Sequence, residues 1–358
     1  MKKKLFFLAA AAVALASCSS DETTAVNSSA SQANQPKEIA FSPFAQAMTR
    51  GAVAIDGAFP IGYNFFISAY AVDAAGDYFG KAEYTREGDS GNTWSGVAGQ
   101  KKYWPLSPET LNFLAVTKSD ADGTNTTFGT ASANYASKVV VELGDNRTAQ
   151  HDLMYAYARA AVTKTGTNGL SFNSGSNVAM AFAHAQSWVN FTVKAGDDAT
   201  AGAGIVVTGI QLKQAVYDGT ATVNLSNYDS KTEALSASLT WDGTAYGSAT
   251  KYDVAVTGIS NIAVNSTSEI AAGNGLMIVP NPTKTAEVLN PSFTTFVISY
   301  TLNGNAYTFE YTPTAAEKQM VPAHKYNFNI TFTLHEIKVD ATVTNWTVDN
   351  HNVTVPGA

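Results

Sequence analysis

The chain has 358 residues, of which 45% are hydrophobic and 14% are charged, and its formal net charge is −7. This length allows about two domains of ~100–200 residues, and the apolar content is high enough for real cores, which excludes wholesale disorder. The acidic balance argues against nucleic acid as a partner, because binding to nucleic acid needs a basic face. The single cysteine cannot form an internal disulfide, which excludes a disulfide-stabilised module.

The first 17 residues resemble the signal peptide of a bacterial lipoprotein. Three lysines precede an apolar run, residues 5–16, that is too short to span a bilayer, which needs about 20 residues. Small residues then lead to Cys18, with Leu15 three positions before it, as in a lipobox. We therefore predict a signal peptide over residues 1–17 and lipidation at Cys18. The alternative is an ordinary signal peptide with a chance cysteine.

Residues 18–36 form a predicted flexible tether. An acidic patch at residues 19–22 resembles an export signal of Bacteroidales lipoproteins that reach the outer face of the outer membrane, although any solvated linker could contain it. The rest of the segment is rich in Ser, Asn, Gln and Ala and has no apolar periodicity, which is typical of a linker.

The first strand is predicted within residues 38–50. Ile39 and Phe41 alternate with other residues and would lie on one face of the strand. Pro43 restricts the strand to a sheet edge, or ends it, because proline cannot donate a hydrogen bond to a ladder.

Short apolar segments separated by turn residues continue through the chain, which is typical of an all-β fold. In the first half these segments are residues 63–72, 78–79, 92–94, 102–105, 111–116, 138–143, 151–158, 178–185 and 188–193. In the second half they are residues 205–210, 221–225, 275–280, 294–300 and 326–334. An Asn-Gly pair at residues 303–304 predicts a hairpin turn. No helix of ten or more residues is expected.

These strands predict two tandem β-sandwich domains of a transthyretin-like or immunoglobulin-like, Greek-key type. The Gly- and Ala-rich segment 195–204 is the expected linker. The N-terminal sandwich would cover residues 37–196, and the C-terminal sandwich would cover residues 203–358.

The tail of the chain, residues 336–358, has a strict apolar alternation at its start. The alternating positions are Ile337, Val339, Ala341 and Val343. The phase changes at Asn345, before Trp346, and a one-residue slip reverses the face of a strand. We therefore predict two short strands in the tail.

Segments in a characteristic order connect the chain to a known family. They are the lipobox cysteine, the first strand up to Thr49-Arg50-Gly51, Tyr103-Trp104-Pro105, residues 111–115, 152–156, 182–193 and 325–330, and the closing Val343-Thr344-Asn345-Trp346. Over nearly its whole length the chain resembles the fimbrillin family of Bacteroidales, the type V pilins. Residues 347–352 depart from the Gly- and Asp-rich turn expected there.

This resemblance implies a structural subunit of cell-surface fimbriae that supports adhesion and biofilm formation. The precursor would be anchored by lipid to the outer membrane, and an Arg-specific protease would cut between Arg50 and Gly51. The first strand, with Ile39 and Phe41, would leave its groove, and a C-terminal strand of another copy or a related subunit would replace it. The implied donor face consists of Ile337, Val339, Ala341, Val343 and Trp346.

Two alternatives from other functional classes remain open. A surface glycan-binding lipoprotein would keep its lipid and would not need Arg50. An anchor subunit would also stay lipidated and uncut, while a tip adhesin would present a binding surface. The alternating face of the tail favours a shaft subunit that donates a strand.

The sequence contains none of the common catalytic motifs, so no enzyme activity, cofactor or metal site is predicted. The scattered histidines are expected to be polar residues at strand ends: His151, His184, His324, His335 and His351. Segment 120–125 begins like a calcium loop, but its twelfth position is Ala131 rather than Glu, which favours a solvated turn. The tryptophans could form a sugar platform but more often pack in cores: Trp94, Trp104, Trp188, Trp241 and Trp346.

Overall fold

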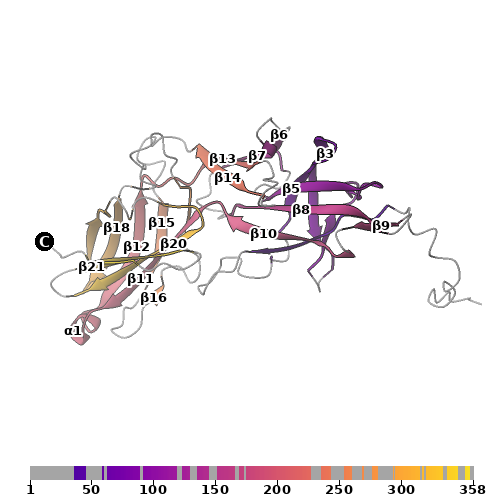
Figure 1. Ribbon diagram of the computed structural model, residues 1–358. Helices are drawn as coiled ribbons and strands as arrows, with labels where there is room; N and C mark the ends of the chain where they lie inside the picture. The colour runs from indigo at the N-terminus through magenta and orange to yellow at the C-terminus, as the bar shows by residue number, and fades with distance from the viewer. Residues whose placement is uncertain are drawn as a thin grey trace, which may run out of the picture.

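Strands make up nearly all the regular structure of the computed structural model, which is elongated and has two lobes (Figure 1). The structure describes residues 36–45, 59, 63–88, 92–118, 123–129, 135–144, 151–165, 169–172, 175–226, 235–242, 254–259, 268–269, 276–280, 293, 295–314, 317, 320–333, 337–345 and 351–354. The α-helix whose bounds lie within the described residues is α1 (Asp198–Ala201). None of the described helical segments has the length and apolar character needed to cross a membrane. The prediction of an all-β fold is confirmed.

The first lobe is an eight-stranded sheet that closes on itself. Its strands, in the order of pairing, are β10 (Val178–His184), β1 (Phe41–Ala45), β4 (Trp94–Gly96), β3 (Gly76–Arg86), β2 (Phe65–Ala71), β5 (Glu109–Thr117), β8 (Met154–Thr165) and β9 (Gly169–Phe172). β10 also pairs with β8, which completes the ring. The ring encloses the first core, whose largest side chains are Phe41, Phe59, Phe65, Tyr84, Trp94, Trp104, Phe113 and Phe182.

The second lobe contains two sheets whose inner faces share the second core. One sheet contains β16 (Ser268–Glu269), β11 (Ser187–Ala195), β20 (His324–Phe332), β21 (Ile337–Asn345) and β22 (His351–Thr354), with β17 (Leu276–Ile278) also paired to β11. The other contains β15 (Val254–Ile259), β12 (Ile205–Lys213), β18 (Thr295–Leu302) and β19 (Asn305–Tyr311). Rings of Phe191, Phe296 and Phe328 meet between the sheets, with centroids 5.2–5.5 Å apart.

A third, four-stranded sheet joins the two lobes. Its order is β14 (Ala237–Asp242), β13 (Gly219–Ser226), β7 (Tyr135–Leu143) and β6 (Thr126–Gly129). Two strands from the second half of the chain thus join two from the first half through the pairing of β13 with β7. Side chains of this sheet form a junction core with the outer face of β5, including Leu114 and Val116. The indole of Trp241 donates a hydrogen bond of 2.7 Å to the carbonyl of Ala185, which fixes the point where the chain passes between lobes.

The position of β11 differs from the sequence prediction. Residues 188–193 were expected to end the first sandwich, but β11 pairs in parallel with β20 over eight residue pairs and contributes Val189, Phe191 and Val193 to the second core. Segment 195–204, the expected linker, therefore connects β11 to β12 within the second lobe. Alternation along β11 predicts a strand but not the sheet that receives it, which depends on a partner more than 130 residues away.

The Asn-Gly hairpin prediction is confirmed. Asn303 and Gly304 both adopt positive φ, 51° and 80°, between β18 and β19. Such a two-residue turn matches the twist of paired strands, and asparagine and glycine tolerate it best. The tail also forms two strands, β21 and β22, as expected from its change of phase.

Candidate strand-exchange groove

β1 is inserted between two strands that come from distant parts of the chain. It runs parallel to β10 over five residue pairs, from Phe41–Val178 to Ala45–Phe182. On its other side it pairs with β4 only through Phe41 and Trp94. We call the space that β1 occupies the β1 groove.

The residues just before β1 extend the same pairing. The amide of Ile39 donates to the carbonyl of Lys102 at 2.8 Å, and the amide of Trp104 donates to the carbonyl of Lys37 at 2.9 Å. On the opposite side, the amide of Val178 donates to the carbonyl of Ala40 at 2.9 Å. Along one side of the segment, residue 39 thus bonds to Lys102 and residue 41 pairs with β4, while the carbonyl of residue 40 faces β10.

This alternation explains how β1 accommodates a proline. Pro43 was expected at a strand end or a sheet edge, but β1 continues through it to Ala45. Position 43 faces the β4 side, where β1 has no residue pair beyond Phe41. The missing amide hydrogen therefore removes no ladder bond, so this side of β1 behaves as an edge.

The inward face of β1 is the centre of the first core. Ile39 and Phe41 are fully buried, as their alternation predicts, and Pro43 is also buried. The ring of Phe41 meets the rings of Tyr84, Phe113 and Phe65 edge-on, with centroids 4.9, 5.2 and 6.1 Å away. Aromatic contacts of this kind add to the free energy of apolar burial.

A charged contact also ties this segment to the ring. The Lys101 ammonium lies 2.7 Å from a carboxylate oxygen of Glu38, and this hydrogen bond raises the pKa of Lys101. Burial raises the pKa of Tyr84, and the charge of Glu38 raises it further, so the phenol stays neutral inside the first core. The ion pair itself is largely exposed and contributes little to stability.

The two phenylalanines of β1 provide a matched test of this geometry. Phe41→Ala should lower the free energy of unfolding of the uncut chain by about 3–5 kcal/mol, because it leaves a cavity in the first core. Phe44→Ala should change it by less than about 0.5 kcal/mol, because that ring is 40% exposed. Urea unfolding of both variants measures the difference, and equal effects would contradict the placement of β1.

The predicted donor face lies inside the second lobe of the same chain. Val339 and Ala341 are buried in the second core, and Ile337 and Val343 pack against it half-buried. β21 pairs with β20 along its whole length, from Phe332–Ile337 to His324–Asn345. Cys18, Arg50, Gly51 and Trp346 lie outside the described residues.

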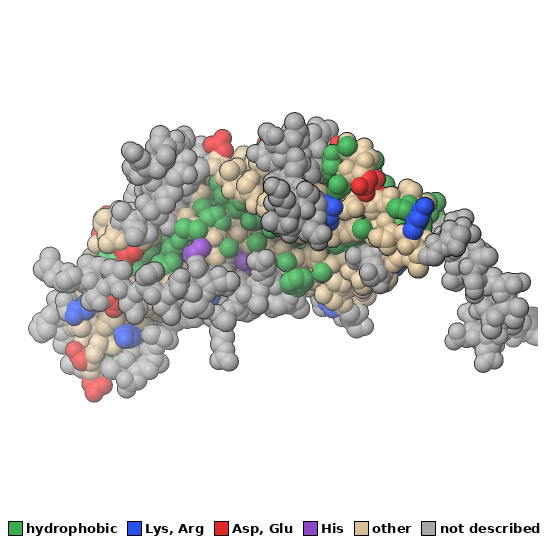
Figure 2. All heavy atoms as spheres, viewed as in Figure 1, with side chains coloured by type: hydrophobic (Ala, Val, Ile, Leu, Met, Phe, Trp, Pro, Cys, Tyr) green, Lys and Arg blue, Asp and Glu red, His purple; other side chains and the backbone are tan. Residues whose placement is uncertain are grey.

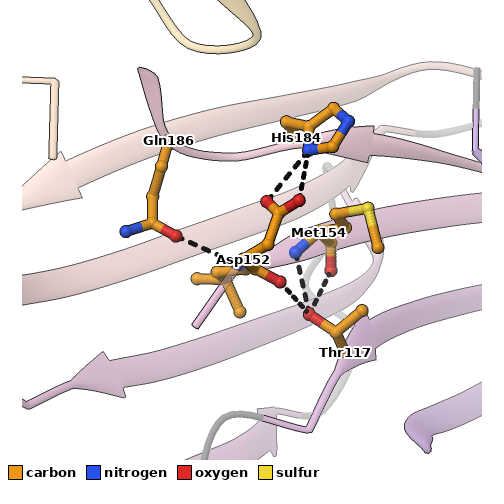
Figure 3. Close-up of polar contacts among 6 residues, drawn as sticks. Thr117, Asp152, Met154, His184 and Gln186 are labelled. Carbon is orange, nitrogen blue, oxygen red and sulfur yellow. Dashed lines mark hydrogen bonds and ion pairs between the residues drawn. The ribbon is translucent and has the colours of Figure 1, made fainter. Parts of the chain in front are cut away.

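A buried polar cluster at the inner end of the first lobe was not foreseen (Figure 3). The imidazole Nδ1 of His184 lies 2.9 and 2.8 Å from the two carboxylate oxygens of Asp152. The Gln186 side chain accepts a hydrogen bond from the amide of Leu153, and Thr117 Oγ1 accepts one from the amide of Met154. His184 does end β10, but it is buried, and the cluster holds the ends of β5, β8 and β10 together.

The other singled-out residues have structural surroundings. Four tryptophans are buried, as expected for core packing: Trp94, Trp104, Trp188 and Trp241. In the loop that resembles a calcium site, the Lys81 ammonium donates to the carbonyls of Gly123 and Thr126, so a lysine already supplies a cation. In the described part of the chain, no three His, Cys, Asp or Glu side chains are placed to hold a metal ion.

The fold defines a two-lobed, all-β protein with its first strand inserted into a closed sheet. A family model described as fimbrillin-like matches residues 53–346, which is most of the chain. The chain belongs to the fimbrillin-like family, and the resemblance seen in the sequence is confirmed. A comparison with curated proteins found no match.

Three of the solved structures that match the chain come from Bacteroides, Parabacteroides and Porphyromonas species. A protein of Bacteroides uniformis described as a cell adhesion protein is 19% identical, with 87% of this chain and 99% of that chain covered and a TM-score of 0.49. A fimbrial assembly protein of Parabacteroides distasonis is 8% identical, with coverages of 89% and 100% and a TM-score of 0.40. The fimbrial anchor protein Mfa2 of Porphyromonas gingivalis is 10% identical, with coverages of 88% and 100% and a TM-score of 0.35.

Proposed function

We propose that this chain is a structural subunit of a cell-surface fimbria that assembles by strand exchange. The precursor is exported as a lipoprotein through Cys18, and an Arg-specific protease cuts it between Arg50 and Gly51. β1 then leaves the first lobe, and a C-terminal strand of another copy or of a related subunit enters the β1 groove. The resulting polymer serves adhesion and biofilm formation outside the outer membrane.

The observation that carries this proposal is the placement of β1. Its inward face fills the middle of the first core, yet it is the only described strand before residue 51. A cut after Arg50 would therefore separate β1 from every other strand of the first lobe. Only non-covalent contacts would then hold it in place.

An incoming strand would find strong interactions in the vacated groove. It would gain main-chain hydrogen bonds to β10 and to Lys102 and Trp104, as in strand addition to an open sheet edge. Each apolar side chain buried in the groove contributes about 1.5–3 kcal/mol. An empty groove would be an aggregation hazard, so β1 protects the monomer until cleavage. A head-to-tail contact of this kind does not close and produces a filament.

The length of the donor follows from where β21 begins and ends. β21 ends at Asn345 beside His324, next to the junction, and begins at Ile337 beside Phe332, at the far end of the second lobe. If β21 stayed in place, the donor would consist of residues 346–358 and would start next to the junction. To reach the far end of the second lobe, it would first have to run back along the nine residues of β21, a distance of about 30 Å at about 3.3 Å per residue. We therefore propose that the donor is the whole tail 336–358, released from the far end of the second lobe.

This donor length has an energetic consequence for the second lobe. Release of β21 exposes Val339 and Ala341, which are now in the second core. The gain in the β1 groove must therefore exceed the loss of these contacts. For the domain organisation we propose a removable strand that ends at Arg50, a first lobe that extends to residue 186, and a second lobe from residue 187.

A glycan-binding role has less support from the described residues. Four of the five tryptophans are buried, and the fifth, Trp346, lies outside the described residues. A sugar platform requires aromatic faces that are open to solvent.

The stability of the assembled form tests the proposed function. Protein extracted from the cell surface in detergent should run as a ladder without heating and as one band after boiling. One monomer band in both samples would contradict assembly by strand exchange.

A further inference from the structure

The end of the first lobe where β1 begins has exposed apolar side chains. We call this end the entry end; it includes Lys37 and the turn that follows β2, and β9 marks it in Figure 1. Tyr78, Tyr103 and Leu106 are exposed there by 36%, 45% and 57%. We call these three residues the entry patch. Figure 2 shows hydrophobic and basic side chains next to each other at this end of the lobe.

The entry patch is an ordered surface. The Tyr78 hydroxyl donates a 2.8 Å hydrogen bond to the carbonyl of Tyr103, which holds the two residues together. Partial burial raises the pKa of Tyr78, and the charge of Glu109 raises it further, so Tyr78 stays a neutral donor. Leu106 follows Tyr103 by three residues, so the three side chains of the entry patch belong to one hydrogen-bonded part of the surface.

The entry patch is continuous with the β1 groove. The amide of Trp104 and the carbonyl of Lys102 flank Tyr103, and both bond to the segment that leads into β1. Glu38 and Lys37 belong to the part removed by cleavage after Arg50. Their loss would free these backbone groups and the Lys101 ammonium, which now pairs with Glu38. Whatever enters the β1 groove at this end would therefore pass over the entry patch.

The opposite end of the β1 groove is directed toward the second lobe of the same molecule. β1 ends with Ala45 opposite Phe182, and three residues later the chain reaches Ala185, whose carbonyl accepts from the Trp241 indole. The carbonyl of Gln186 accepts from the amide of Ala323, which belongs to the second lobe. A donor body placed at this end would meet the second lobe of the same molecule.

We propose that the incoming strand runs in the direction of β1, parallel to β10, and that the entry patch docks the second lobe of the donor copy. The inference rests on the proposed function and specifies its partner surface, a second copy of this chain. A donor tail that enters at the entry end is preceded by Thr333, at the end of β20. The donor's second lobe then lies against Tyr78, Tyr103 and Leu106, and their apolar surface is buried at each joint of the filament.

Cysteine cross-linking tests the direction of the strand. The full chain carries Leu106→Cys with Thr333→Cys, and after cleavage these are its only thiols, because Cys18 is its one native cysteine. A short bismaleimide should link neighbouring copies into a ladder that survives boiling. The matched variant carries Ala183→Cys, at the other end of the groove, with Thr333→Cys, and should give no such ladder. Cross-linking of the second variant but not the first would overturn the inference.

Substitution of the entry patch tests the docking surface. Tyr103→Ser with Leu106→Ser should reduce the assembled fraction about tenfold or more, since buried apolar side chains dominate interface energies. The control variant carries Tyr157→Ser with Val321→Ser, at two positions outside the entry patch whose side chains are 37% and 41% exposed. This variant should assemble normally. Equal assembly of both variants, with unchanged melting temperatures, would overturn the docking role. A wild-type chain without any boil-sensitive ladder would instead refute the proposed function.

Discussion

Arg50→Ala should abolish assembly and leave a lipidated monomer on the cell surface. Without the cut, β1 stays covalently attached to the first lobe, and its inward side chains Ile39 and Phe41 stay in the first core. An incoming strand would have to displace β1. Because the uncut β1 is still part of the same chain, its effective concentration at the groove is high and it would rebind. Immunoblots of unboiled surface extracts measure the result, and no ladder is expected.

Two further variants distinguish the need for arginine at position 50 from other effects of the substitution. Arg50→Lys keeps the positive charge and should also stay a monomer, because the protease is expected to recognise arginine. Gln46→Ala lies in the same segment and should assemble normally. A ladder from Arg50→Ala would contradict the cleavage model.

Deletion of residues 346–358 should give a folded monomer that does not polymerise. It removes more than half of the proposed donor and leaves β21, with Val339 and Ala341, in the second core. A deletion that starts at Asp340 is a weaker test, because it cuts β21 and removes Ala341 from that core. Circular dichroism checks the fold, and gel ladders check assembly.

The control for this deletion is a shorter one that removes only Gly357 and Ala358. It should leave assembly unchanged, because these residues add no large apolar side chain to the donor. Normal polymers from the chain that lacks residues 346–358 would show that the tail is not donated.

Local patterns predicted the parts of the fold that depend on neighbours in sequence. Alternation placed Ile39 and Phe41 on the buried face of β1, and the Asn303-Gly304 pair formed the hairpin turn. The phase change at Asn345 separated β21 from β22. These features follow from strand pleat and turn chemistry, which act over a few residues.

Pairings between distant segments could not be predicted in this way. β1 lies against β10, more than 130 residues away, and β11 belongs to the second core although it directly follows the first lobe. The contact of Asp152 with His184 also depends on how β8 meets β10. A strand's own pattern determines which face is buried, and does not determine its partner strand.

Under the proposed function, the alternating face of the tail would be buried in two different states. The family resemblance implies a donor face of Ile337, Val339, Ala341, Val343 and Trp346. In the monomer Val339 and Ala341 are buried in the second core, and Ile337 and Val343 pack against it. The same alternation would suit the β1 groove, where Ile39, Phe41 and Pro43 point inward at every second position. We infer that assembly exchanges one buried site for another.

N-terminal sequencing of surface-assembled protein tests the central claim most directly. The proposed cut predicts a mature chain that begins at Gly51, without the tether and without β1. A chain that begins at an acylated Cys18 in the assembled material would contradict cleavage. It would instead indicate an anchor subunit or a surface lipoprotein that keeps its first strand.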